Sequence, residues 1–205
     1  MDPLSLVSTV TGLGTLSGVN LYLTVLLTGL AVRFNFLSLG QNHESLMVFA
    51  NPWVIGISSV LYLVEFFADK IPWLDSIWDA VHTFIRPAGA CLIALETLGD
   101  ASPLLKTAGV LIAGGSSLTT HTAKAATRAV ANVSPEPVSN VALSLVEDAK
   151  VAGGTAMMFL FPTIMLVLCV LVLVALWLVL PRLFRRIGGF FRILKLKIFG
   201  VPGQA

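Results

Sequence analysis

Four ionisable residues are spaced so that one helical face would carry all of them. Asp75, Asp79, His82 and Arg86 follow one another at intervals of four, three and four residues. Such intervals place side chains on one face of an α-helix. A face that alternates acid, acid, imidazole and guanidinium can be a self-neutralising row of ion pairs. It can equally conduct protons or cations, and the sequence leaves both interpretations open.

A second predicted helical face is cationic. His121, Lys124 and Arg128 share it by similar spacing, and they follow a run of small residues at 114–120. If that run is a turn, the N–H groups at the start of the next helix would form an anion site. Phosphate, a lipid headgroup or a substrate carboxylate would fit there. Alternatively, the cations pair inside the protein with acids. The candidate acids are Asp79, Glu147 and Asp148.

Two acids end a repeated apolar motif. Residues 61–65 are Leu-Tyr-Leu-Val-Glu, and residues 143–147 are Leu-Ser-Leu-Val-Glu. Carboxylates are costly inside a bilayer, where they usually face a cavity, a partner or water. The repetition therefore suggests a duplicated fold with a polar site between its halves, in which Glu65 and Glu147 would be symmetry mates.

Motifs for catalysis and for metal binding are absent from the sequence. There is no Gly-x-Ser-x-Gly, no phosphate-binding loop and no His-Glu-x-x-His. His43, His82 and His121 form no His-x-x-x-His pair, and Cys91 and Cys169 form no Cys-x-x-Cys pair. We therefore expect no enzyme, no dedicated metal site and no cofactor.

Composition points to the membrane. Of 205 residues, 56% are hydrophobic and only 12% are charged, with a mean hydropathy of +0.90. Soluble domains carry about 25% charged residues. Several apolar runs approach the roughly 20 residues that span a bilayer. We expect an all-α membrane protein whose partner is the lipid bilayer, with no role for nucleic acid.

About six transmembrane or re-entrant helices are predicted. They cover residues 4–32, 47–67, 75–98, 103–128, 138–150 and 155–180. The first is interrupted by glycines around Asn20 and the fourth by the small residues at 114–120, so both are expected to be broken helices. The sixth should kink at Pro162. Segments 75–98 and 138–150 are short of a clean span and could re-enter the membrane instead.

These segments divide residues 1–180 into two similar halves, at about 4–98 and 104–180. Each half would begin with a broken helix and continue with a helix that carries the repeated acid. An odd number of crossings in each half would make the two halves inverted repeats. The chain is short for a monomeric transporter, so a homodimer is plausible.

Charge is distributed unevenly along the chain. Residues 1–150 carry a net charge of −4, whereas residues 151–205 contain no acid and carry +6. The basic residues of the final part are Arg182, Arg185, Arg186, Arg192, Lys195 and Lys197. Because they directly follow the last apolar run, the C-terminus should be cytoplasmic. Residues 181–205 would form an amphipathic tail that lies on anionic lipids.

Three stretches of the sequence resemble a known family. They are residues 68–87 (ADKIPWLDSIWDAVHTFIRP), 122–125 (TAKA) and 132–140 (NVSPEPVSN). The family consists of small bacterial integral membrane proteins catalogued only as a domain of unknown function, and the resemblance covers roughly residues 10–180. It implies a polytopic protein of the bacterial inner membrane and supplies no catalytic or ligand residues.

Our preferred hypothesis is a small channel or secondary transporter with a polar site between the two halves. Its substrate would be a small ion or an anionic solute. The candidate pathway residues are Asn20, Glu65, Asp69, Asp79, His82, Arg86, His121, Lys124, Arg128, Glu147 and Asp148. One alternative is the binding or translocation of an anionic lipid or lipid-carrier phosphate. A second is a membrane scaffold subunit whose polar residues serve partner helices.

Overall fold

The computed structural model describes residues 3–35, 44–132 and 138–199, and in these ranges it is entirely helical. The all-α prediction is therefore confirmed. The helices are α1 (Pro3–Val19), α2 (Leu21–Arg33), a 3-10 helix η1 (Glu44–Ala50), α3 (Pro52–Ala68), α4 (Pro72–Leu98), α5 (Pro103–Ala131), α6 (Val138–Leu160) and α7 (Pro162–Phe199).

Proline and capping residues set the helix boundaries. The helices α3, α4, α5 and α7 each begin at a proline, whose missing N–H costs nothing in the first turn. The side chain of Asn51 accepts a hydrogen bond from Trp53 N at 2.9 Å and caps α3. Gly99 adopts a φ of 48° in the tight turn between α4 and α5, a conformation that favours glycine.

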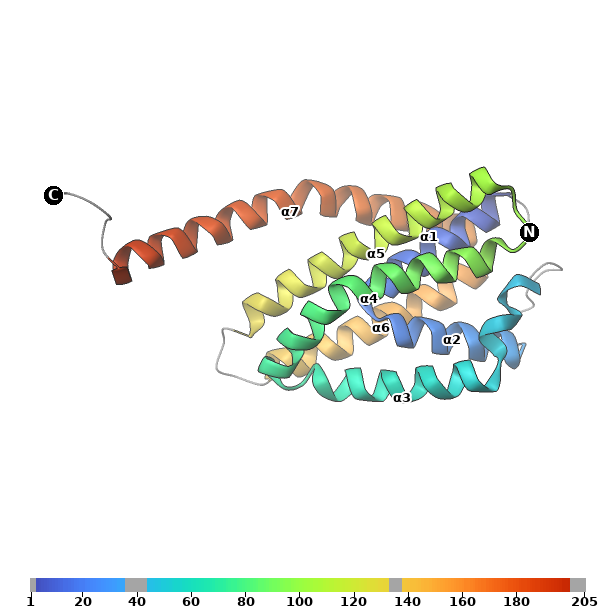
Figure 1. Ribbon diagram of the computed structural model, residues 1–205, viewed down its shortest axis with the longest axis horizontal. Helices are drawn as coiled ribbons and strands as arrows, with labels where there is room; N and C mark the ends of the chain where they lie inside the picture. Colours follow the sequence, from blue (N-terminus) through green and yellow to red (C-terminus); the bar gives the residue numbers. More distant parts are fainter. Residues whose placement is uncertain (1–2, 36–43, 133–137, 200–205) are drawn as a thin grey trace.

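The first predicted segment is broken into two half-helices, as expected. Asn20 separates α1 from α2, with extended backbone at φ −151° and with its Oδ1 accepting from Leu23 N at 3.0 Å. Figure 1 shows that α1 runs from the end of the bundle marked N into its middle, and that α2 returns to the same end. The two helices thus form a hairpin whose apex, at Asn20, is buried.

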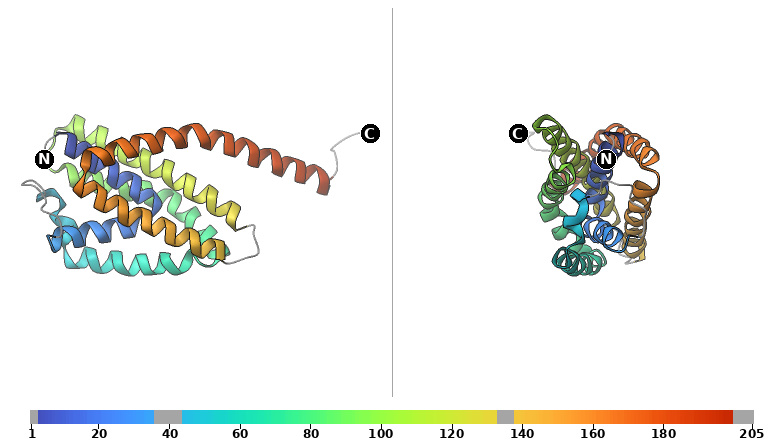
Figure 2. Two further views of the ribbon diagram at one scale, coloured as in Figure 1. Left: turned by 180° about the vertical axis from the view of Figure 1, so that it is seen from behind. Right: turned by 90° about the vertical axis from the view of Figure 1, so that its right-hand side faces the viewer.

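The remaining α-helices run the length of the bundle in alternating directions (Figures 1 and 2). We call the end where α1 starts and where Gly99 lies the hairpin end. The opposite end, with the turn at residues 69–71, is the tail end, because α7 extends beyond the bundle there. The hairpin packs among its neighbours, with α1 against α5, α4 and α7 and with α2 against α3 and η1.

The second half of the chain differs from the prediction. The helix α5 is continuous from Pro103 to Ala131, so the small residues at 114–120 are not a break. In the first half, α4 runs from Pro72 to Leu98 and contains Pro87. Because the α1–α2 hairpin returns to its starting end, both halves of the chain begin at the hairpin end (Figure 1). The inverted relation between the halves stays a prediction.

Helix boundaries near the C-terminus also differ from the prediction. The fifth segment does not stop at residue 150, because α6 continues to Leu160. Pro162 starts a new helix rather than kinking one, since it lacks the N–H that an unbroken helix would use. The helix α7 then continues through Pro181 to Phe199, so the basic tail prolongs this helix and is not a separate element.

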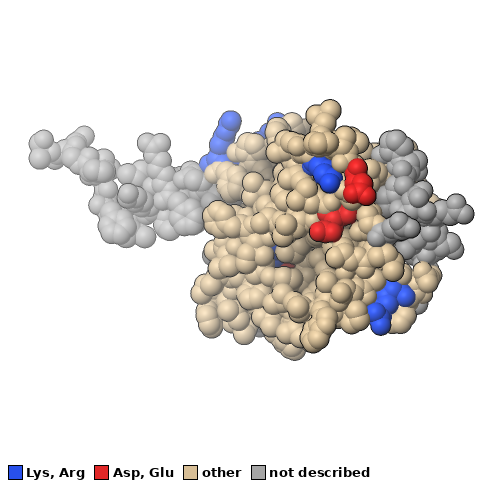
Figure 3. All heavy atoms as spheres, turned by 45° about the vertical axis from the view of Figure 1, so that its right-hand side comes forward, with Lys and Arg blue, Asp and Glu red and all other residues tan. Residues whose placement is uncertain are grey.

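The distribution of polar and apolar side chains is inverted relative to a soluble domain. Large apolar side chains are exposed on every α-helix except α2. Buried positions, by contrast, include many charged and hydroxyl-bearing residues. Figure 3 shows one face of the bundle, where charged side chains occupy only small patches of the described surface. One stretch, Pro162–Arg182, is long and apolar enough to cross a membrane by itself.

Glycines allow α1 and α5 to approach each other closely. A Cβ at Gly18 would lie 1.9 Å from Thr120 Oγ1 and 2.3 Å from Ser117 O, and one at Gly14 would lie 2.6 Å from Ala113 Cα. Atoms cannot approach so closely, so a larger side chain at either position would separate the two helices.

We therefore expect Gly18→Ala to destabilise the protein by about 1–3 kcal/mol, as overpacking typically does. The matched control is Gly115→Ala, because a Cβ there would have no neighbour within 4 Å and alanine favours the helix. Thermal unfolding of the purified variants in detergent measures the difference. Equal melting temperatures for the two variants would contradict the close approach.

Candidate functional site

Eight charged side chains from four neighbouring helices and one turn meet inside the tail-end half of the bundle. We call this set the buried charge network, and each member is at most 7% exposed. Its members are Glu65, Asp69, Asp75, Asp79, Arg86, Lys124, Arg128 and Glu147. The two polar faces predicted from helical spacing, at residues 75–86 and 121–128, meet where α4 contacts α5. Glu65 from α3 and Glu147 from α6 join them.

Arg86 joins four elements of the fold. Its Nη2 donates to Glu65 Oε1 at 2.7 Å, and its Nη1 donates to the Gly18 carbonyl at 3.0 Å. Nη1 also lies 2.8 Å from His121 Nδ1, and Asp79 Oδ1 is 3.8 Å from Nη2. The guanidinium therefore places a positive charge at the C-terminal end of α1, where the helix dipole favours it.

The contacts of His121 determine its tautomer. A guanidinium can only donate, so Nδ1 accepts from Arg86 and the ring proton is on Nε2. That nitrogen lies 3.0 Å from the backbone oxygen of Asp79 and 3.1 Å from Thr83 Oγ1. His121 is therefore a neutral imidazole that links α5 to α4.

Lys124 connects the two acids of the repeated motif. Its Nζ lies 3.4 Å from Glu65 Oε1 and 3.4 Å from Glu147 Oε2, and it contacts Asp69 Oδ2 at the same distance. The two glutamates thus come together at one ammonium although they are 82 residues apart in the sequence.

Arg128 is held by carboxylates on several sides. Its Nη2 donates to Glu147 Oε2 at 2.7 Å and its Nε donates to Oε1 at 3.2 Å, which makes the pair bidentate. Nη2 also donates to Asp69 Oδ2 at 3.0 Å, and Nη1 is 3.8 Å from Asp75 Oδ1. Asn132 supports this end by donating to Asp75 Oδ2 at 2.8 Å.

Polar contacts also hold the apex of the hairpin. Asn20 Nδ2 donates to Asp148 Oδ1 at 3.2 Å, and the Tyr62 hydroxyl donates to Asp148 Oδ2 at 3.0 Å. Next to the apex, the Tyr22 hydroxyl is 3.0 Å from His82 Nε2. The other ring nitrogen of His82 lies 2.7 Å from the Trp78 carbonyl. All the pathway residues predicted from the sequence are therefore in or beside one connected polar region.

Carboxylates outnumber cations in this region. The network contains five acids but only three cations, and Asp148 adds a further carboxylate beside it. Both oxygens of Asp79 lack a hydrogen-bond partner, as do Glu65 Oε2 and Asp69 Oδ1. A buried charge is costly unless it is compensated, and these carboxylate oxygens are the least compensated groups of the network.

Asp79 faces a cavity of about 250 Å³ between α4 and α5 near the tail end. The lining residues are Ser76, Asp79, Ala80, Thr83, Ala125, Arg128, Ala129 and Asn132. Sequence reasoning did not select Ser76, Thr83 or Asn132 as site residues. The signal was present for Asn132, which follows Arg128 by four residues and so shares its helical face.

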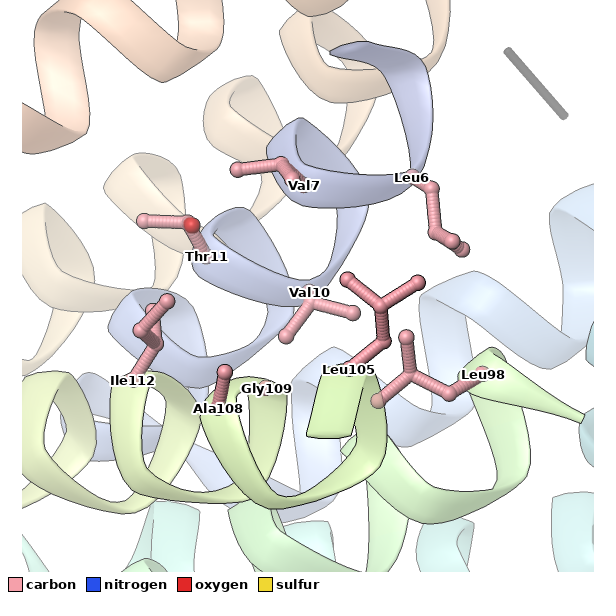
Figure 4. Close-up of a pocket in the computed structure, with 9 residues that line it drawn as sticks. All are labelled: Leu6, Val7, Val10, Thr11, Leu98, Leu105, Ala108, Gly109 and Ile112. Carbon is pink, nitrogen blue, oxygen red and sulfur yellow. The ribbon is translucent and has the colours of Figure 1, made fainter. Parts of the chain in front are cut away.

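A different cavity, of about 170 Å³, lies at the hairpin end among α1, α5 and the end of α4 (Figure 4). Its side chains are apolar except for Thr11. The cavity has no ionisable side chain in its lining, so it offers no group for acid–base or ion chemistry.

Other predicted features take different positions from those expected. The small residues at 114–120 are inside α5, where Thr120 donates to the Thr15 carbonyl at 2.9 Å. Their N–H groups are therefore used within the helix and form no anion site. Among the described residues, no group of three or more His, Cys, Asp or Glu could hold a metal ion; His43 lies outside the described residues.

The basic tail is only partly described. Arg182 and Arg185 are exposed on α7. Arg186, Arg192, Lys195 and Lys197 belong to the same helix, but their side chains lie outside the described part of the structure. The predicted contact of this tail with anionic lipids stays a prediction.

Removing Arg128 should destabilise the protein strongly. Arg128→Met leaves Glu147 and Asp69 without their closest cation, and breaking a buried ion pair in this way costs about 3–5 kcal/mol. The control is Arg185→Met on the exposed surface of α7, which should change stability by about 0.5 kcal/mol or less. Chemical unfolding in detergent measures both variants. An Arg128→Met protein as stable as the control would show that the network contributes no stability.

Comparison with known proteins identifies the family. The family model described as Domain of unknown function (DUF4126) matches residues 7–182, so the chain belongs to this family, in agreement with the resemblance found in its sequence. No curated protein and no solved structure matches the chain.

Proposed function

We propose that this member of the DUF4126 family is a small membrane channel or secondary transporter for a cation. The proposal places it in the bacterial inner membrane with the tail end on the cytoplasmic side. The single observation that carries it is the buried charge network, in which acids outnumber cations. Within this network, Asp79 lines a cavity, and its carboxylate has no hydrogen-bond partner.

The surface supports a location in the membrane. Apolar side chains such as Trp53, Phe84 and Leu111 are at least 70% exposed, and lipid would cover them. The helices α4, α5 and α6 bury most of their charged side chains inside the bundle, while Glu96 and Lys150 are exposed. This arrangement explains why only α7 is apolar enough to qualify as a span by itself: the others become compatible with lipid only after they pack together.

The fold supports five crossings and one re-entrant hairpin. The helices α3 to α7 would span the membrane, whereas α1 and α2 would enter from the hairpin end and return to it (Figure 1). The N-terminus and the C-terminus then lie on opposite sides, unlike the same-side arrangement that six crossings would give. Arg182 and Arg185 place positive charge at the tail end, which the positive-inside rule assigns to the cytoplasm.

The polar region extends through only part of the bundle. It begins near Asp75 at the tail end and reaches Arg86, which contacts the hairpin apex through the Gly18 carbonyl. Beyond the apex, the described core between α1, α4 and α5 buries hydroxyl groups but no charged side chain, and it includes the apolar cluster of Val10, Ala94 and Ala113. We propose that a cation enters from the cytoplasmic side and that this apolar layer closes the route on the other side.

The interrupted helix also supports transport. Broken helices whose ends meet near the middle of the bilayer are a recurring way to build ion and substrate sites. Here the break at Asn20 is next to the network, and Asp148 and Arg86 both bind to it. An anionic substrate has less support, because carboxylates already bind Arg86, Lys124 and Arg128.

The topology can be tested by cysteine labelling in cells. Asp100→Cys at the hairpin end should react with a membrane-impermeant maleimide added outside, because the proposal exposes that turn to the exterior. Arg185→Cys should react only after the membrane is permeabilised. Labelling of both positions from the same side would exclude an odd number of crossings between them.

Transport can be tested in proteoliposomes with H⁺, Na⁺ and K⁺ as the probe ions and Cl⁻ as the anion control. We expect the protein to carry at least one of the cations, and Asp79→Asn to reduce that flux by about tenfold or more, since an uncompensated carboxylate is worth at least about 1.4 kcal/mol to a cation. Glu96→Gln is the matched control, because Glu96 is an exposed acid on the same helix.

Two outcomes would count against the proposal. Flux of all three cations at the level of empty liposomes would favour a scaffold role over transport. Equal cation flux through Asp79→Asn and Glu96→Gln would remove Asp79 from the route.

A further inference from the structure

A cavity of about 340 Å³ lies among α5, α6 and α7, apart from the Asp79 cavity. Each helix contributes one stripe of side chains at helical spacing, and Val19 of α1 completes the lining. The stripes are Thr120, Ala123, Lys124 and Thr127 of α5; Leu143, Val146, Glu147 and Lys150 of α6; and Val172 and Leu176 of α7.

One charge in this cavity has no counter-ion among the described residues. Glu147 is bound by Arg128 and Lys124, and Lys124 is itself surrounded by three carboxylates. The ammonium of Lys150, by contrast, takes part in none of the ion pairs of the described part of the chain. Lys150 is exposed, so it gives the cavity a positive charge that no described side chain compensates.

Lys150 lies near the middle of its helix. It follows Val138 by twelve residues and precedes Leu160 by ten, so it is about 15 Å or more along the axis from either end of α6. In the proposed membrane orientation its ammonium would be deep in the hydrocarbon layer. A lysine at such a depth is rare, and it normally has an anionic partner.

The cavity opens to the outer surface of the bundle between α6 and α7. Val146 and Val172, one on each side, are 49% and 45% exposed. The walls are mainly apolar, with the polar groups of Lys124, Lys150, the two threonines and the paired Glu147 on the α5 and α6 sides. A ligand that satisfies both features combines an anionic group with a hydrocarbon chain.

We infer that this cavity binds an anionic membrane lipid, with the lipid phosphate paired to Lys150 and the start of an acyl chain between Val146 and Val172. A phosphate diester and an ammonium form a charge-assisted hydrogen bond. This inference requires the membrane location proposed above, but it does not require transport.

A second copy of the chain is a weaker candidate for the occupant. It would have to supply an exposed carboxylate at the depth of Lys150. The exposed acids of the described residues, Glu96 and Asp100, are instead at the hairpin end. Free inorganic phosphate is also less suitable, because the apolar walls would exclude water from it without gaining a hydrophobic contact.

Native mass spectrometry of the full-length protein in mild detergent tests the inference. The probes are phosphatidylglycerol, which is anionic, and phosphatidylcholine, which is zwitterionic. We expect the protein to prefer phosphatidylglycerol and Lys150→Ala to weaken that binding by about tenfold, because hydrogen bonds to charged groups are among the stronger ones. Lys150→Arg should restore it.

Two controls separate this site from other basic surfaces. Lys106→Ala removes a lysine at the hairpin end of α5 and should leave binding unchanged. The double variant Arg182→Gln and Arg185→Gln removes charge from the tail and should leave the Lys150-dependent binding in place. The inference would be overturned by equal binding to wild type and Lys150→Ala. It would also be overturned by loss of binding in the tail variant alone, or by displacement of the lipid by millimolar inorganic phosphate.

Discussion

The fold depends on compensating three cations that are buried among helices. Arg86 bonds α4 to α3, α5 and α1, while Lys124 and Arg128 bond α5 to acids from α3 and α6. Breaking a buried pair costs several kcal/mol, so no one of these helices can shift without uncovering a charge on another. The acids, however, exceed the cations. The same constraint that fixes the bundle therefore leaves Asp79 without a hydrogen-bond partner beside its cavity.

The helix α5 separates two cavities of different character. Ala125, Ala129 and Asn132 line the polar cavity at Asp79, whereas Thr120 and Thr127 line the cavity at Lys150. Arg128 lines the first cavity and Lys124 lines the second, and both cations bind Glu147 and Asp69. A charge that arrives in either cavity therefore changes the electrostatic potential in the other through side chains in direct contact.

Helical periodicity was sufficient to find the polar faces of α4 and α5, because side chains three or four residues apart must share a face. The break at Asn20 was also predictable from a polar residue beside glycines. The continuity of α5, by contrast, was not predictable from the sequence. Its glycines looked like a break, yet each costs only about 1 kcal/mol in a helix, and a Cβ at Gly114 would lie 2.7 Å from Cys91 Sγ of α4. The packing of α5 against other helices and the reversal of the chain at α2 both depend on contacts between residues far apart in the sequence.

The α1–α2 hairpin is made long before the residues that hold it. Asn20 is synthesised 128 residues before Asp148, to which its side chain donates a hydrogen bond. Gly18 is synthesised 68 residues before Arg86, which donates to the Gly18 carbonyl. At typical synthesis rates the first interval is on the order of ten seconds. During that time the polar side chain of Asn20 lacks Asp148, although η1 and α3, the main neighbours of α2, follow it directly. The polar contacts at the apex are therefore completed only after α6 has been made.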